Sequence, residues 1–483
     1  MLRCAMTKLA RMVSGSFQRS GRAAIGSLFL ALTLGGCASV HNLPLNTPVS
    51  NPVGGLIRPA GAAEASIPVR TVSGDTVIGL AFSGGGTRAS AFAYGVLDRM
   101  SKYQTRRQEP LLDQVGLVSG VSGGAIMAAY YGLKGPAALH DFRSRYLTQD
   151  LMAQIDTRFS VANIARAVGG GVNTDNKLRD WFNANLFHDA TFGDLAGRRP
   201  VTLINATDIY NRTPFLFSPQ TFAAACSDLT QYPLAAAVAA SAAVPGAFAP
   251  VVIETFPDRC RTPLPAWVTA ATANQNASPL LHAYARGLTD IRSGRVKYVK
   301  LLDGGLIDNY GLSGITILRA GQSTPYGPLR PQEAINLRRL MFLVVDAGQG
   351  PKGDWSSTLE GPAGKELVGA VVDVLVDSNA RASYTGFDQT MKAWREQIVN
   401  WRCGLKPAEA ARLRGKSGPW NCRDLKFTIA RVSFEQLGSE RAKALGAVPT
   451  SFTLPVDTID MLTQAGADAL DDNAAFQAFL RDM

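Results

Sequence analysis

A serine inside a glycine-rich turn is the feature that most constrains this chain. Residues 115–124 read VGLVSGVSGG: an apolar run of strand character meets a turn of small residues, and helix-forming residues follow from Ala125. In a G-x-S-x-G pattern between strand and helix, the small residues let the backbone bend sharply and lift the serine hydroxyl above a sheet. The helix start beyond it, including the N–H of Gly123, offers positive charge to a developing oxyanion. The pattern predicts an α/β fold with Ser122 as nucleophile; a bystander serine in a strand–helix turn is the alternative.

A second glycine-rich loop precedes the serine. Residues 76–82 (TVIGLAF) read as a buried strand that runs into Ser83 and three glycines, and a helical pattern begins at Ala89. Consecutive glycines let N–H groups converge on negative charge, as in a phosphate cradle or an oxyanion hole. The spacing also fits a dinucleotide fingerprint, but a serine turn one strand later favours an oxyanion loop made by Gly84, Gly85 and Gly86. Arg88 either adds charge there or lies on the helix surface.

A third motif places a carboxylate at the end of a strand. Residues 298–305 (YVKLLDGG) read as a strand that ends in Asp303, and the two glycines after it leave little bulk around the carboxylate. Ligand sites in α/β sheets lie at the carboxyl ends of strands, so Asp303 is the candidate partner of Ser122. The alternative is an aspartate that only caps the following turn.

These motifs, in this order, resemble those of the patatin-like phospholipase family. Residues 240–250 (ASAAVPGAFAP) strengthen the resemblance, because the family carries a similar segment between its serine and its aspartate. The resemblance covers about residues 76–350 and implies a three-layer α/β/α sheet. It also implies a lipid acyl hydrolase of the phospholipase A or lysophospholipase type, with a Ser122–Asp303 dyad and no cofactor. Two departures are Ala89, where the family's loop often has glycine, and Ser83 at the start of the loop.

The positions of the histidines favour a dyad independently of the resemblance. A Ser–Asp–His hydrolase of the α/β type carries its histidine after the acid. A triad with Asp208 and His282 stays open on chain order, although neither residue has a strand-end context with small neighbours. In a dyad the carboxylate itself takes the serine proton, so burial must raise its pKa toward neutrality. All four histidines precede Asp303: His41, His140, His188 and His282.

The first 36 residues predict an export signal. Basic residues precede a short apolar run, Ala23 to Leu34, that cannot span a bilayer as a mature helix. The following Gly35-Gly36-Cys37 resembles a bacterial lipoprotein box, which implies lipidation of Cys37 and anchoring to a cell-envelope membrane that faces the periplasm or the cell surface. An ordinary signal peptide with a chance cysteine is the alternative. Residues 37–70, with frequent Pro, Asn and Gly, predict a flexible tether.

Charge and cysteine usage narrow the remaining possibilities. Five positive charges of the formal +11 lie in the signal, which has no acidic residue, so +6 stays on the mature chain. Scattered basic residues without a nucleic-acid motif argue against nucleic acid as a partner and fit an anionic lipid surface. No Cys/His cluster has metal-ligand spacing, so no metal is expected. Besides Cys37, the mature chain has four cysteines, and this even number in an exported protein suggests two disulfides, most simply Cys226–Cys260 and Cys403–Cys422.

The chain divides into a hydrolase domain and a C-terminal extension. The hydrolase domain is expected at 71–350, and residues 351–483 change character to an α+β extension packed on the core. Within the extension, the pattern predicts helices at 367–376 and 461–479 and a strand at 426–433. Two rival functions remain: an envelope binding or assembly protein that keeps the fold without turnover, and a dinucleotide-binding enzyme.

Overall fold

A mixed eight-stranded sheet is the centre of the molecule. The computed structural model describes residues 42–49, 74–154, 175–260, 263–351, 353 and 355–483. Within them the strand order is β5-β6-β3-β2-β1-β7-β8, and β4 pairs with β3. The strands are β1 (Thr76–Phe82), β2 (Val115–Val121), β3 (Val201–Asp208), β4 (Thr213–Leu216), β5 (Val251–Glu254), β6 (Tyr298–Asp303), β7 (Arg339–Asp346) and β8 (Lys426–Ser433).

Strand direction brings the third sequence motif to the same edge as the first two. Neighbouring strands are parallel from β3 through β2, β1 and β7 to β8, so their carboxyl ends share one edge. Strand β6 runs antiparallel to β3, and Asp303 pairs with Ala206 near the end of β3. Strand β2 pairs Val121 with Asn205, the residue before Ala206 in β3. Ser122, which follows Val121, therefore lies level with Asp303. Asp303 therefore reaches this edge from the opposite direction to the parallel strands.

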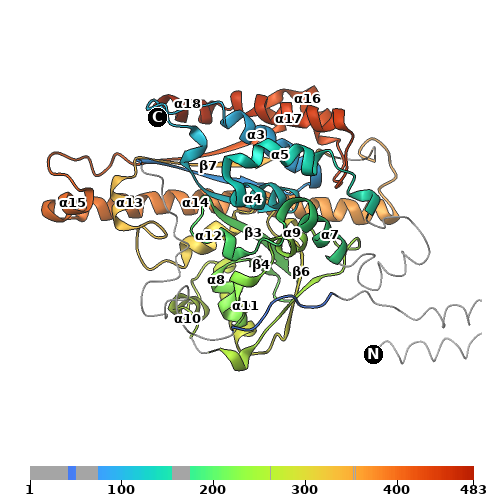
Figure 1. The fold of residues 1–483 in the computed structure, drawn as a ribbon, viewed down its shortest axis with the longest axis horizontal. Coiled ribbons are helices and arrows are strands. Elements are labelled where there is room, and N and C mark those ends of the chain that lie inside the picture. Colours follow the sequence, from blue (N-terminus) through green and yellow to red (C-terminus); the bar gives the residue numbers. More distant parts are fainter. Residues whose placement is uncertain (1–41, 50–73, 155–174, 261–262, 352, 354) are drawn as a thin grey trace, which may run out of the picture.

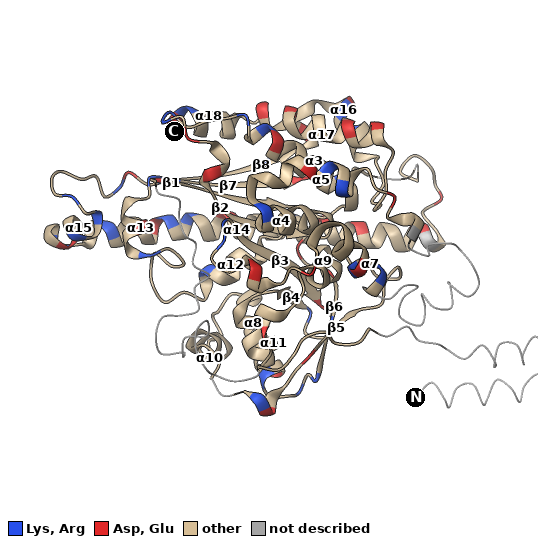
Figure 2. Cartoon of the chain, in the orientation of Figure 1, with Lys and Arg blue, Asp and Glu red and all other residues tan. Residues whose placement is uncertain are grey.

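Helices cover both faces of the sheet, which confirms the predicted three-layer α/β/α architecture (Figure 1). Alternate residues of β1 show the two layers: Ile78, Leu80 and Phe82 belong to one apolar cluster, and Val77 and Ala81 belong to the other. Charged residues of both signs are interspersed on the outer helices (Figure 2). The larger cluster includes α3 (Gly86–Met100), α4 (Gly123–Lys134), α5 (Ala138–Phe142), α7 (Asp175–Phe182), α8 (Pro219–Ala225), α9 (Leu234–Ser241), α10 (Ala266–Ala273), α11 (Pro279–Arg292), α16 (Ser439–Gly446), α17 (Val456–Asp471) and α18 (Ala474–Asp482). The smaller includes α12 (Ser313–Ala320), α13 (Pro331–Asn336) and α14 (Gly364–Gly404), and α15 (Pro407–Arg414) packs on α13.

The C-terminal extension completes the sheet. The strand predicted at 426–433 is confirmed as β8, and it pairs with β7 over its full length. The extension therefore supplies a strand of the central sheet and does not only pack on its surface. The helix predicted at 461–479 is two helices, because the Asn473 side chain accepts the N–H of Phe476 at 3.0 Å and starts α18.

Helix α17 of the extension packs closely on α3. A Cβ at Gly95 would lie 2.0 Å from the carbonyl oxygen of Thr463, and a Cβ at Gly466 would lie 2.3 Å from that of Phe92. Only glycine lets the two backbones approach this closely. The extension and the strands before residue 350 are therefore parts of one core.

Residues 42–49 contact the folded core, although they fall in the segment expected to be a flexible tether. The Asn46 amide donates to Ser227 Oγ at 3.0 Å and to the Glu254 carbonyl oxygen at 2.8 Å. The Asn42 amide donates to the carbonyl oxygens of Ala249 and Pro250 at 2.9 and 3.0 Å. Both asparagines are buried, so these bonds replace water and hold the segment on the protein. The prediction of a free tether is wrong for these eight residues, and the rest of 37–70 lies outside the described residues.

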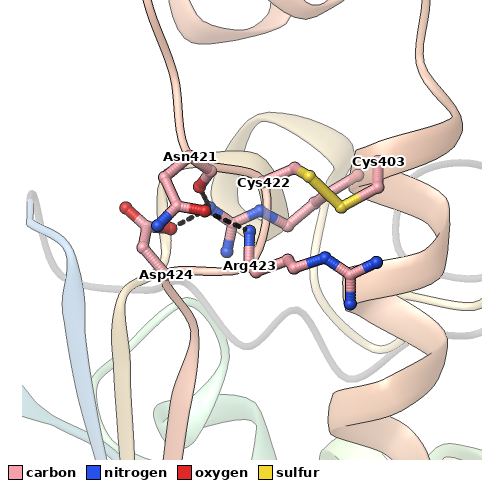
Figure 3. The surroundings of a disulfide bond; sticks show 6 residues. Cys403, Asn421, Cys422, Arg423 and Asp424 are labelled. Atoms are coloured by element: carbon pink, nitrogen blue, oxygen red, sulfur yellow. Dashed lines mark hydrogen bonds and ion pairs between the residues drawn. A yellow bond between two sulfur atoms is a disulfide. The ribbon is translucent and has the colours of Figure 1, made fainter.

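Two disulfides join neighbouring segments. Cys226, after α8, pairs with Cys260, and Cys403, near the end of α14, pairs with Cys422 in the loop before β8. Figure 3 shows the second pair beside Asp424, which pairs with the buried guanidinium of Arg402. The Arg402 guanidinium also donates to the Leu337 carbonyl oxygen at 3.0 Å. These contacts tie the long helix to the end of the sheet.

The α3–α17 contact gives the first prediction. Gly466→Ala places a methyl group against the backbone of α3, so we expect it to lower the free energy of unfolding by about 1–3 kcal/mol. The matched control is Gly386→Ala in α14, where a Cβ meets nothing within 4 Å. That change should be neutral or stabilise by up to about 1 kcal/mol. Denaturant melts that find Gly466→Ala harmless would show that the two helices do not pack this closely.

Candidate active site

Ser122 stands in a strained turn at the carboxyl edge of the sheet. It follows β2 and is the N-cap residue of α4, with φ 51° and ψ −124°. A positive φ is unfavourable for a residue with a Cβ, and such strain persists only where the surroundings impose it. A Cβ at Gly120 would lie 2.5 Å from the Gly124 carbonyl oxygen, and one at Gly124 would lie 2.4 Å from that of Phe82. The neighbouring glycines are therefore required for the bend.

A chain of hydrogen bonds supports the turn from β3 and α9. The Ser122 N–H donates to Ser241 Oγ at 2.9 Å, and the Ser241 hydroxyl donates to the Asn205 carbonyl oxygen at 2.6 Å. The Asn205 amide then donates to Ser119 Oγ and to the Gly120 carbonyl oxygen. Neither Ser241 nor Asn205 was predicted from the sequence to have a role in the site. The available signals were a serine at the start of the 240–250 segment and a polar residue within an apolar strand.

The Asp303 carboxyl lies next to Ser122. Its Oδ1 accepts the Gly305 N–H at 2.8 Å, and the Ser122 side chain is near enough to favour its charged form. The backbone N–H of Asp303 donates to the Ala243 carbonyl oxygen at 2.9 Å, which holds the end of β6 against the loop after α9. Asp303 therefore caps the turn Gly304–Leu306, which was the alternative role for this residue, and its carboxyl also lies beside Ser122.

Burial sets the protonation of Asp303. Removal from water raises the pKa of this carboxyl from 3.8 to about 6, although the hydrogen bonds from Gly305 and Ser122 favour the charged form and lower it. At pH 7 the group is mostly ionised, yet it holds a proton far more readily than an exposed aspartate. A carboxylate with a pKa near neutrality is suited to accept and return a proton.

The glycine loop after β1 presents free N–H groups beside the serine. Gly84 N–H is not one of them, because it donates to the Asn309 carbonyl oxygen at 3.0 Å. Its required feature is its small size: a Cβ there would lie 2.3 Å from Asn309 Oδ1 and 3.3 Å from Ser122 Cβ. Among the described residues, the N–H groups of Gly85, Gly86 and Gly123 have no hydrogen-bond acceptor. These three donors are the available ones for a developing oxyanion.

The C-terminal extension covers the far side of the glycine loop. The Thr87 N–H donates to the Ser451 carbonyl oxygen at 2.8 Å, and a Cβ at Gly86 would lie 2.4 Å from the same oxygen. A dinucleotide phosphate in this position would meet a carbonyl oxygen, so the cradle that the fingerprint requires is occupied by the protein itself. No residue of this segment was singled out from the sequence, which has no local signal for so distant a contact.

Arg88 is buried next to the glycine loop and does not lie on the helix surface. Its guanidinium is buried and donates to the carbonyl oxygens of Ala347 and Val448 at 2.8 and 2.7 Å. Burial lowers the pKa of Arg88 to about 10, and the nearby carboxylates of Asp346 and Asp373 oppose this shift. A Cβ at Gly85 would lie 2.7 Å from the guanidinium. The residue therefore joins the loop to the segments after β7 and α16.

The two positions that depart from the expected loop pattern have structural roles. Ser83 Oγ accepts the Ala347 N–H at 2.9 Å, which ties the start of the loop to the end of β7. The methyl group of Ala89 is buried in the larger apolar cluster.

The alternative triad is not assembled. Asp208 accepts hydrogen bonds from the N–H groups of Tyr210 and Asn211 and caps the turn after β3. His282 lines a surface cavity with Arg286 and Asp290. Among the described residues, no histidine is hydrogen-bonded to Ser122 or Asp303, and no group of three or more His, Cys, Asp or Glu could hold a metal ion. His41 lies outside the described residues.

Comparison with known proteins gives one family match. Residues 80–314 match the patatin-like phospholipase family. The search of curated proteins finds no match. Among solved structures, the chain is similar to human GIVD cytosolic phospholipase A2, with a TM-score of 0.38 and 13% sequence identity. The alignment covers 84% of this chain and 62% of that chain, so this chain spans less than two thirds of its length.

The pKa of Asp303 predicts a pH-dependent difference in stability. Because folding raises this pKa from 3.8 to about 6, the stability that the carboxyl contributes is complete below pH 3.8 and is lost as the pH rises through 6. Asp303→Asn removes this ionisation and should be more stable than the wild type at pH 7, by up to about 3 kcal/mol. Thermal melts from pH 4 to 8 measure this difference, which should shrink toward pH 4. A variant that is less stable by the same amount at every pH would contradict the assignment.

Proposed function

This chain contains a patatin-like phospholipase domain at residues 80–314, and members of that family are lipid acyl hydrolases. From this premise, we propose that the protein hydrolyses acyl esters of lipids through a Ser122–Asp303 dyad, as a phospholipase A or lysophospholipase. The observation that carries the proposal is the position of the Ser122 side chain beside a buried carboxyl whose pKa is raised to about 6. No histidine is needed for this chemistry.

In the acylation step, Ser122 Oγ attacks the ester carbonyl carbon while Asp303 accepts the hydroxyl proton. The carbonyl oxygen becomes an oxyanion, which the N–H groups of Gly85, Gly86 and Gly123 stabilise without reorganisation. Collapse of the tetrahedral intermediate breaks the bond to the leaving alcohol. Asp303 returns the proton to that alcohol, and an acyl-serine remains.

In the deacylation step, Asp303 takes a proton from water, which attacks the acyl-serine. The same donors stabilise the second oxyanion, and Ser122 regains its proton as the fatty acid leaves. The positive φ of Ser122 supports this assignment, because a strained turn holds the hydroxyl between the base and the oxyanion donors. Gly84 contributes by its small size and Arg88 by positioning the loop, so neither is assigned a catalytic role.

The Leu34–Cys37 box supports a membrane location for this activity. We assign the N-terminal segment as an export signal that ends before a lipidated Cys37, and the cell envelope as the location. Lipid substrates and lipid anchor would then share one membrane.

The dyad predicts a specific pattern of mutant activities. Ser122→Ala and Asp303→Asn should each abolish ester hydrolysis, because one lacks the nucleophile and the other has an amide that cannot accept its proton. His140→Ala, His188→Ala and His282→Ala are the controls, and each should keep turnover within about tenfold of the wild type, under 1.4 kcal/mol in barrier height. The assay is release of p-nitrophenol from a short-chain ester, with folding checked by circular dichroism.

The same assay gives a pH profile. Since the base must be ionised, kcat/KM should rise as the pH increases through about 6 and then stay level. A histidine variant that loses activity as completely as Ser122→Ala would indicate a triad. A wild-type protein without any turnover would favour the envelope binding role.

The anchor has its own test. Cys37→Ser should remove the acyl chains and release the protein from the membrane fraction, because each buried methylene contributes about 0.8 kcal/mol to binding. Mass spectrometry of the mature N-terminus measures the modification. An unmodified wild-type Cys37 would refute the lipoprotein assignment without affecting the dyad.

A further inference from the structure

The first half of α14 exposes apolar side chains to an unusual degree. This helix has 41 residues, and its second half packs under the sheet through buried residues such as Phe387, Met391 and Trp394. Six apolar side chains near its start are 37–66% exposed, although isolated exposed apolar residues are more usual on a protein surface. They are Leu367, Val368, Val371, Val372, Val374 and Leu375.

These six side chains occupy one face of the helix. At 3.6 residues per turn they cover an arc of about 160°. Glu366, Asp373 and Asp377 lie together on the opposite side. Asp373, which is half-buried, is close enough to the buried Arg88 to act on its pKa, whereas Glu366 and Asp377 are exposed. An ordinary surface helix buries its apolar face, and this helix leaves it exposed.

The apolar face lies beside the candidate active site. One turn further along α14, the Asn379 amide donates to the Leu306 carbonyl oxygen at 2.9 Å, and Ser383 donates to Asp308 at 2.8 Å. Leu306 is only three residues after Asp303. In the loop before the helix, Trp355 and Leu359 are further exposed apolar side chains.

The path of the N-terminal segment brings a lipid anchor to the same region. Cys37 lies five residues before Asn42, and five residues span at most about 18 Å. The Asn42 amide is bound to Ala249 and Pro250, and the preceding part of that loop accepts the N–H of Asp303 through Ala243. A bilayer that holds Cys37 would therefore lie within about 18 Å of Asn42, which is bound to the loop that also contacts Asp303.

We propose that the exposed face of α14, residues 367–375, docks on a phospholipid bilayer and sets the active-site mouth against the membrane. The inference rests on the proposed lipid hydrolase function and names the surface through which that function reaches its substrate. The helix lies in the plane of the membrane, with the apolar side chains at the boundary of headgroups and acyl chains. Among the described residues, no helix is long and apolar enough to cross a membrane.

Fluorescence quenching tests the contact directly and independently of turnover. The protein carries Ser122→Ala, so that the vesicles stay intact, and Val371→Trp on the exposed face. In vesicles of brominated phosphatidylcholine, this tryptophan should be quenched beyond the level of the parent protein. The matched control is Val456→Trp, at an exposed apolar position of α17. No added quenching at residue 371 would overturn the proposal.

A kinetic experiment separates this inference from the catalytic one. The triple variant Val368→Gln/Val371→Gln/Leu375→Gln keeps residues that favour helix but removes the apolar face. The ratio of phospholipid hydrolysis in vesicles to hydrolysis of a soluble short-chain ester should fall roughly tenfold or more. Val456→Gln/Met461→Gln should leave the ratio unchanged.

The other outcomes are equally distinct. If the triple variant keeps the wild-type ratio of vesicle hydrolysis to soluble-ester hydrolysis, the membrane contact is refuted. The proposed dyad is not affected by that result. A wild-type protein that hydrolyses neither substrate would sink the proposed function itself. Light scattering that finds a dimer which the triple variant dissociates would assign the face to a second copy of the chain and overturn the proposal.

Discussion

The contact between the Ser122 side chain and the buried carboxyl of Asp303 is the interaction on which the proposed site depends. A carboxylate is a poor base for a serine when water surrounds it, because its pKa is then near 4. Here burial raises the pKa to about 6, and the hydrogen bonds from Gly305 and Ser122 limit the increase. The carboxyl must therefore be shielded from water, and this happens at the edge of the sheet where β6 meets the oppositely directed β3.

Distant parts of the chain build that edge. Strand β2 delivers the serine turn, and β6 enters antiparallel so that its last residue reaches the same level. Ser241 and Asn205 connect the turn to α9 and β3. The glycine loop is held by the Ala347 N–H, which donates to Ser83 Oγ, and by the Ser451 carbonyl oxygen, which accepts the Thr87 N–H. Ala347 and Ser451 lie outside the matched family region of residues 80–314, so residues beyond that region help to shape the glycine loop.

The sequence predicted those features whose signal is local. Strands at 76–82, 298–303 and 426–433 follow from apolar or alternating runs, and the three-layer sheet was implied by the family resemblance that the motifs carry. The contact of Ser451 with the glycine loop had no such signal, because it joins residues more than three hundred positions apart. Docking of residues 42–49 was missed for a related reason: two asparagines look like loop residues until their buried partners are known. The use of the Gly84 N–H by Asn309 also depends on tertiary structure alone.

Covalent labelling tests the central claim most directly. A fluorophosphonate reacts with an activated serine, and peptide mapping by mass spectrometry identifies the modified residue. The account predicts a single adduct on the peptide that contains Ser122, and loss of labelling in both Ser122→Ala and Asp303→Asn. Labelling of a different serine, or undiminished labelling in Asp303→Asn, would contradict a dyad in which Asp303 activates Ser122.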